Sequence, residues 1–123
     1  AENERMHLMT FIEIAQPSTF ERFLIFLAQI CFGTFYTILY IFFNRTAHRM
    51  IGYFEEEAVV SYTEYLDEID KGQIENTQAP EIAINYWNLA KDASLRDVVI
   101  AVRNDEAGHR DKNHLIADDL DPA

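Results

Sequence analysis

Two Glu-x-x-His pairs stand near opposite ends of this chain, Glu4 with His7 and Glu106 with His109. Residues three apart on a helix lie on one face, one turn apart. Each pair therefore offers a carboxylate and an imidazole to the same point in space. Two such pairs, together with further inward glutamates, are what a helical bundle needs to hold two iron or manganese ions.

An acidic triplet, Glu55-Glu56-Glu57, lies about halfway between the pairs. On a helix, Glu55 shares a face with Val59 and Tyr62. The faces of the two pairs continue as stripes of mixed polarity, which are Glu4, His7, Phe11 and Ile14 near the start and Val99, Val102, Glu106, His109 and Asn113 near the end. These patterns favour a metal site inside a bundle. The plainer alternative, solvated acidic faces with two incidental histidines, stays open on spacing alone.

Length and composition limit which other classes of protein and partner are possible. The chain has 123 residues, one domain's worth or less, and its hydrophobic content of 49% is enough to build a core. The formal net charge of −11 argues against nucleic acid as a partner and against simple electrostatic adhesion to anionic lipid. The single cysteine, Cys31, excludes an internal disulfide, and its apolar surroundings predict a small buried hydrophobe.

A long apolar segment follows the first pair. No residue from Phe23 to Phe43 carries a charge, and Gln29, Thr34 and Thr37 are its only polar interruptions besides tyrosine hydroxyls. As a helix it is ~32 Å long, enough to cross a bilayer. Hydropathy alone makes it a transmembrane candidate, and a buried helix of a soluble core is the alternative.

Local signals divide the chain into helices without strands. Pro17 ends the first helix, Ser18 or Thr19 caps the second, and Ser94 caps the last. A polar loop with Gly72 and Pro80 as breakers precedes a short helix. The predicted helices are residues 3–15, 20–43, 46–70, a short one from Pro80 or Glu81 that includes Tyr86 and Trp87, and 94–117.

Four segments carry a resemblance to a known family. In order, they are ENERMHLMTFIE, HRMIGYFEEEAVVSYTEY, YWNLAKDASLRDVV and NDEAGHRDKNH. They resemble successive signatures of the alternative oxidases, which are non-haem di-iron ubiquinol oxidases. The resemblance implies an all-α fold: a ferritin-like di-iron four-helix bundle, with three of the four bundle helices present, plus a long hydrophobic membrane-associated helix. Residues 1–123 are then a single partial domain, with 20–43 as the membrane-associated helix.

The resemblance also implies a ligand set for two iron ions. Glu4 and Glu106 match the bridging positions, Glu55 matches a terminal ligand, and His7 and His109 match the imidazole ligands. The family's fourth glutamate lies on an earlier helix that no segment here matches, so an N-terminally truncated chain is expected. A lone spanning helix would separate its two flanking helices across the membrane, and we therefore expect the family's monotopic attachment to one leaflet.

The implied reaction is oxidation of ubiquinol with reduction of dioxygen to water, without proton pumping, in a respiratory electron-transport chain. Tyr62 resembles the family's tyrosine near the metals, a candidate redox or proton-coupled residue, although a core tyrosine is the alternative. Phe54, Glu57, Ala58 and Ser61 match positions that line the quinol cavity. The implied partners are ubiquinol, dioxygen, a membrane and a second copy of the chain. The implied location is a bacterial or mitochondrial inner membrane.

Residues outside the ligand set complete the comparison with the family. Asn3, Asp105, Tyr86 and Trp87 match an outer hydrogen-bond network that would orient the ligands. Plain hydrophobic packing is the alternative for Tyr86 and Trp87.

Three further positions carry weaker expectations. His48 matches a family histidine whose role stays open, and His114 is expected at the surface. Gly108 stands where the family usually has Glu or His, and a glycine inside a helix costs ~1 kcal/mol relative to alanine.

Two other functions stay open. One is another ferritin-like di-iron enzyme that modifies quinones, which substrate-dependent oxygen uptake would distinguish. The other is an inactive membrane-associated helical fragment that lacks the fourth glutamate.

Overall fold

The computed structural model describes residues 2–120 and contains five helices. They are α1 (Glu2–Ala15), α2 (Thr19–Phe42), α3 (Asn44–Asp70), α4 (Glu81–Trp87) and α5 (Leu95–Asp119). Within these residues the only β-type pairing is an isolated bridge between Gln78 and Ser94. The predicted all-α fold is confirmed, and the predicted ends of each helix lie within one turn of the observed ones.

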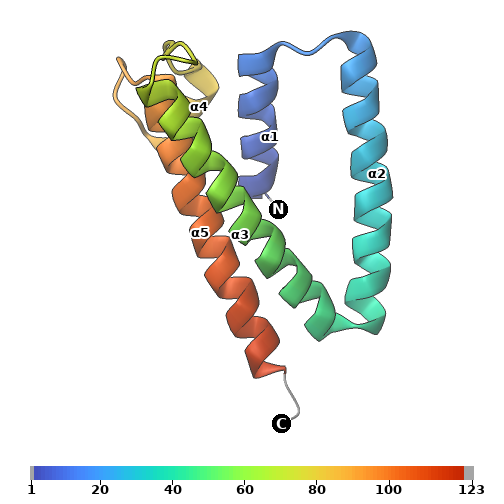
Figure 1. The fold of residues 1–123 in the computed structure, drawn as a ribbon. Helices are drawn as coiled ribbons and strands as arrows, with labels where there is room; N and C mark the ends of the chain where they lie inside the picture. The colour runs from blue at the N-terminus through green and yellow to red at the C-terminus, as the bar shows by residue number, and fades with distance from the viewer. Residues whose placement is uncertain (1, 121–123) are drawn as a thin grey trace.

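The long helices α3 and α5 lie side by side and form the centre of the molecule, with α1 next to them (Figure 1). The core is densest near the start of α5, where Val98, Val99 and Val102 are fully buried. Phe11 packs against the cluster that contains Val98 and Val102, and Ile14 packs against the one that contains Val99. The inward stripe predicted for the last helix is therefore confirmed at its apolar end, and it is what holds α1 in place.

Helix ends follow the sequence signals. Ser18 accepts the Glu21 N–H at 3.2 Å while Glu21 accepts the Ser18 N–H at 3.1 Å, which is a complete capping box for α2. Ser94 and Asp97 form the equivalent box for α5. These caps satisfy N–H groups that the helix itself leaves unpaired. They fix where α2 and α5 begin.

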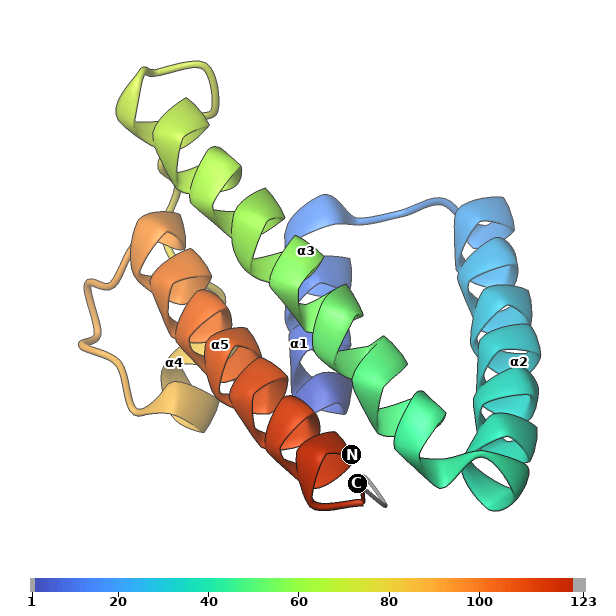
Figure 2. The same ribbon diagram turned by 60° about the horizontal axis from the view of Figure 1, so that its bottom comes forward.

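Helix α2 stands apart from the rest of the molecule, joined to α3 at one end (Figure 2). None of its residues is buried, and large apolar side chains such as Phe26 and Phe42 are 56% and 71% exposed. Its mean hydropathy reaches 1.9, so by length and composition it could enter or cross a membrane. Within the described residues, no segment buries α2 as the buried-core alternative would require. The prediction of a buried Cys31 was wrong, because Cys31 shares the exposure of the whole helix.

Candidate metal centre

Three helices bring four potential metal ligands to one point. Glu4 comes from α1, Glu55 from α3, and Glu106 and His109 from α5. One oxygen or nitrogen atom from each lies within 4.8 Å of those of the other three. Glu55 and Glu106 are buried, whereas the Glu4 side chain is half exposed. The two ends of the sequence thus meet as the Glu-x-x-His spacing predicted.

The two histidines contact glutamates of both pairs. His7 Nδ1 lies 3.6 Å from Glu4 and 2.7 Å from Glu106, and His109 Nδ1 lies 3.7 Å from Glu106 and 2.7 Å from Glu4. The imidazole rings are stacked, with centroids 6.2 Å apart. His7 is outside the group of four but borders it through Glu106. Each imidazole is therefore placed beside two carboxylates.

Two oxygens at the centre have no hydrogen-bond partner. Glu55 Oε2 and Glu106 Oε1 are both buried without a hydrogen bond, although Glu106 Oε1 forms an ion pair with His7 Nδ1 at 2.7 Å. A buried carboxylate oxygen without a partner costs several kcal/mol unless a cation or a proton compensates it. Carboxylate oxygen and imidazole nitrogen are ligands that iron accepts. The residues present therefore fit an iron site.

Without a metal, protons supply the missing positive charge. Burial, reinforced by the nearby charges of Glu106 and Glu4, raises the pKa of Glu55 to about 9. Burial by itself would lower the pKa of His7, but its bonds to Glu106, Glu4 and Asp105 prevail and raise it to about 10. The nearby His7 imidazole outweighs burial and lowers the pKa of Glu4 to about 2. At neutral pH the metal-free centre thus holds a protonated Glu55 and a charged His7.

Asp105 anchors the far side of the His7 ring. Its Oδ2 lies 2.9 Å from His7 Nε2 and accepts hydrogen bonds from Trp87 Nε1 and Asn3 Nδ2, both at 2.9 Å. Asn3 also donates to the Tyr86 hydroxyl at 3.0 Å. Burial would raise the pKa of Asp105, but these hydrogen bonds lower it. The ionised carboxylate directs His7 Nδ1 towards the glutamates, as partners of metal-bound histidines commonly do.

A cavity of about 650 Å³ adjoins the carboxylates. Its lining comes from α1, α2, α3 and α5, and consists of Glu4, Gln29, Phe32, Tyr36, Ile51, Phe54, Glu55, His109 and Asn113. The lining therefore combines carboxylates and an imidazole with aromatic rings. A space of this size and polarity suits a small aromatic molecule.

Comparison with known proteins agrees with this geometry. The family model described as alternative oxidase matches residues 1–118. The chain belongs to the alternative oxidase family. It is 58% identical over 118 residues to the mitochondrial ubiquinol oxidase of Batrachochytrium dendrobatidis, to ubiquinol oxidase 2 of Nicotiana tabacum and to ubiquinol oxidase 1a of Arabidopsis thaliana. Each match covers 96% of this chain and 37%, 40% and 33% of the respective relative, so the chain spans well under half of their length.

The residues that the alternative oxidase resemblance assigned to quinol binding are only partly gathered by the structure. Phe54 lines the cavity. Glu57, Ala58 and Ser61 continue along the same face of α3, but they are exposed or half exposed and lie outside the cavity lining. They therefore border a more open part of the α3 surface.

Tyr62 lies two helical turns beyond Glu55 on α3, on the face that the spacing predicted. Its ring stacks on Phe11 with centroids 5.8 Å apart, and the residue is half buried. Burial and then the charges of Glu106 and Glu4 raise the pKa of Tyr62 to about 12. The phenol is therefore protonated at neutral pH and lies in the electric field of the carboxylates.

A second polar cluster between α3 and α5 was missed from the sequence. The prediction that His114 lies at the surface was wrong, because its ring is packed between the helices: Nε2 lies 2.8 Å from Glu56, Nδ1 lies 2.7 Å from Arg49, and the ring meets the edge of Tyr53. An available signal was the spacing of Arg49, Tyr53 and Glu56, which places them on one face of a helix. We call Arg49, Tyr53, Glu56 and His114 the α3–α5 clamp.

The two other open positions are now placed. His48 Nδ1 lies 2.9 Å from Asn113 Oδ1 and its ring meets Tyr40 of α2, so it sits at an interface between helices. Asn113 in turn donates to the His109 carbonyl at 2.9 Å. Gly108 leaves α5 uninterrupted, and a Cβ added there would meet nothing within 4 Å.

Proposed function

We propose that the protein carrying this sequence is a ubiquinol oxidase that reduces dioxygen to water. The observation that carries the proposal is the convergence of Glu4, Glu55, Glu106 and His109 within 4.8 Å, with two buried carboxylate oxygens that lack a hydrogen bond, in a chain of the alternative oxidase family. The names of its relatives supply the substrate. A non-enzymatic helical fragment would have no use for buried carboxylates that lack a hydrogen bond.

Five residues of this chain would hold two iron ions. Glu4, Glu55 and Glu106 would supply carboxylate oxygens, and His7 and His109 would supply nitrogen. When bound, the irons would supply the redox chemistry that passes electrons from quinol to dioxygen. The protein's own part is to hold these side chains in register on three helices, which the core around Val99 and Val102 supports.

Other residues would act around the ligands. Asp105 holds His7 in one orientation through the bond between Oδ2 and Nε2. The protonated Tyr62 phenol would serve as a redox or proton-coupled group, because it is buried in the field of the carboxylates. Phe54 would form part of the quinol-binding wall, with Glu57, Ala58 and Ser61 further along the same face.

We propose that residues 1–123 belong to one catalytic domain whose helix α2 lies in one leaflet of the mitochondrial inner membrane. The exposed apolar surface of α2 and the mitochondrial relatives support this location. A spanning α2 would place α1 and α3 on opposite sides, yet both contribute to one site. By the family resemblance, proton pumping is not expected. The family resemblance favours a homodimer.

The test is iron content and oxygen uptake of the whole gene product in detergent, with a short-chain ubiquinol as reductant. We expect about two irons per chain and cyanide-resistant uptake that is lost in Glu106→Ala. The matched control is Glu64→Ala, an exposed glutamate on α3. Iron-loaded protein that consumes no oxygen with ubiquinol would overturn the proposal, and a hydroxylated quinone product would indicate a quinone-modifying enzyme instead.

A further inference from the structure

The two imidazoles of the metal centre are held in different ways. Asp105 anchors His7 through the ring nitrogen Nε2, and the His7 side chain is only 6% exposed. The His109 side chain is 31% exposed, and among residues 2–120 no group forms a hydrogen bond with its Nε2. The ring of His109 is therefore held less firmly than that of His7, and its position has to be fixed through another part of the residue.

The main chain of His109 is held by Asn113, one turn further along α5. Asn113 Nδ2 donates to the His109 carbonyl at 2.9 Å, in addition to the backbone bond that the helix supplies. Because a carbonyl can only accept, the nitrogen end of the amide must face it, and the oxygen end is left to face α3. His48 Nδ1 of α3 lies 2.9 Å from Asn113 Oδ1 and must be the donor. The amide is thus fixed at both ends.

Asn113 also lines the cavity beside the carboxylates. Its oxygen and its nitrogen are both bonded within the protein, to His48 and to His109. Recognition of a molecule in the cavity would require one of these bonds to break. The geometry therefore suits a link between α3 and α5 better than a ligand contact.

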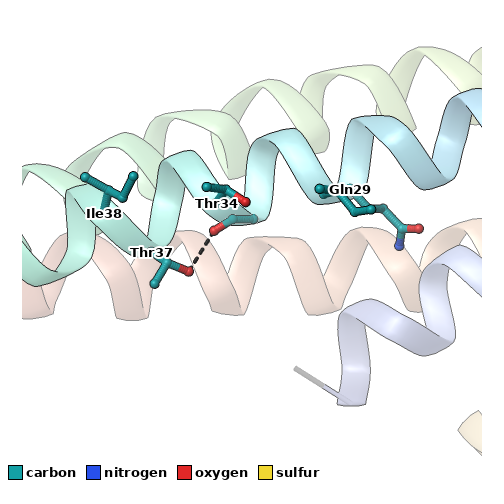
Figure 3. A pocket seen from close by; sticks show the side chains of 6 residues that line it. Gln29, Thr34, Thr37 and Ile38 are labelled. Carbon is teal, nitrogen blue, oxygen red and sulfur yellow. Dashed lines mark hydrogen bonds between the residues drawn. The ribbon is translucent and has the colours of Figure 1, made fainter.

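Helix α2 touches this link through an aromatic ring and not through a polar group. Thr37 donates to the Gly33 carbonyl at 2.7 Å, so its hydroxyl is satisfied within α2, as the dashed line in Figure 3 shows. Tyr40, one turn further on, meets the His48 ring edge-on at 74°, with centroids 5.7 Å apart. This contact restricts rotation of the His48 ring and so helps to keep its N–H on Asn113.

Building on the metal centre of the proposed function, we propose that Asn113 is a positioning residue for His109. It acts through the His109 carbonyl, and His48 keeps the nitrogen end of its amide towards that carbonyl. Side chains that bind a metal must be held to within about 0.5 Å of the required geometry. Asp105 does this for His7 through the ring, and Asn113 does it for His109 through the main chain.

Iron(II) titration of the metal-free whole gene product in detergent tests this role without any turnover. We expect Asn113→Leu, which is of similar size but has no amide, to bind iron about tenfold more weakly. His48→Phe removes the N–H but keeps a ring beside Tyr40, and it should have a similar effect. His48→Asn places an amide N–H close to the position of Nδ1 and should restore most of the affinity. The matched control is Asn104→Leu, at an exposed asparagine of the same helix, which should bind iron as wild type does.

Two ligand variants separate positioning from general support of the fold. In His109→Ala the imidazole that Asn113 positions is gone, so adding Asn113→Leu should not weaken iron binding further. In His7→Ala the same addition should still weaken it about tenfold. An equal loss in both backgrounds would overturn the role, because Asn113 would then support the whole centre. Unchanged iron affinity in Asn113→Leu alone would overturn it as well.

The titrations also separate this inference from the proposed oxidase. Wild type that binds no iron would overturn the metal centre, and the role of Asn113 with it. Wild type that binds iron but does not oxidise ubiquinol would overturn the oxidase alone. The iron affinities of the Asn113 and His48 variants would still decide whether Asn113 positions His109.

Discussion

Replacing Gly52 with alanine should destabilise the protein, whereas the same change at Gly108 should stabilise it. Both glycines lie inside long helices, Gly52 in α3 and Gly108 in α5. A Cβ on Gly52 would lie 2.6 Å from His114 Cε1 and 2.7 Å from both of its ring nitrogens. These distances are shorter than any real carbon contact, so the ring must move. A Cβ on Gly108 meets nothing within 4 Å.

The magnitude follows from how the His114 ring is held. Alanine gains ~1 kcal/mol over glycine in a helix interior at either site. At Gly52, overpacking costs about 1–3 kcal/mol. Displacing the ring also weakens its bonds to Arg49 and Glu56, each worth about 0.5–1.5 kcal/mol. We expect a net loss of about 2 kcal/mol for Gly52→Ala and a gain of about 1 kcal/mol for Gly108→Ala.

Thermal unfolding of the metal-free protein, followed by helical circular dichroism in one detergent, measures the difference. The two variants should differ in Tm by several degrees on opposite sides of wild type. Adding His114→Ala to Gly52→Ala should remove the clash and recover part of the loss. Equal Tm values for Gly52→Ala and Gly108→Ala would show that the His114 ring does not occupy the space beside Gly52, and the reasoning would fail.

Three further predictions concern the metal centre. Asp105→Asn removes the charge that orients His7, and we expect iron affinity, measured by titration of metal-free protein, to fall about 10–100-fold; unchanged affinity would contradict this role. Iron binding at pH 7 should release protons and tighten as pH rises, because the pKa of Glu55 is about 9 and that of His7 about 10 without metal. Since both pKa values are raised in the metal-free fold, its free energy of unfolding should fall as pH rises from about 4.5 through these values. Calorimetry of iron binding in buffers of different ionisation enthalpy would detect the released protons. Tyr62→Phe should keep iron and the stack on Phe11 while turnover in the oxygen-uptake assay falls on the order of a hundredfold; full turnover would leave Tyr62 a packing residue.

The helices and the inward ligand stripes were predictable because they rest on local patterns. A capping box such as Ser18 with Glu21 needs only four consecutive residues, and a helical face needs only a spacing of three or four. For the same reason the spacing of Glu106 and His109 placed both beside the partner pair. Family resemblance supplied the outer network around Asp105, which no local pattern would have found.

The positions that were wrong or missed depend on contacts between helices. His114 looked like a surface residue because it is off the face of His109. It is packed because α5 continues along α3 far enough to place the ring over Gly52, where the missing side chain leaves room. Cys31 looked buried because its neighbours are apolar, but no described segment covers that part of α2. Neither the register of two helices nor the absence of a covering partner is encoded in a local pattern.

The metal centre lies between two structures that hold α5 independently of any ion. On one side, Val99 and Val102 are fully buried in the apolar core. On the other, the α3–α5 clamp ties His114 to Glu56 and Arg49, and Arg49 also pairs with Asp118. The spacing between α3 and α5 is therefore set on both sides of Glu106, whose buried Oε1 lacks a hydrogen bond and remains in place at an energetic cost. Because that cost is met by the flanking packing, the ligands are preorganised, and iron binding should change the protonation of the centre far more than its helical structure.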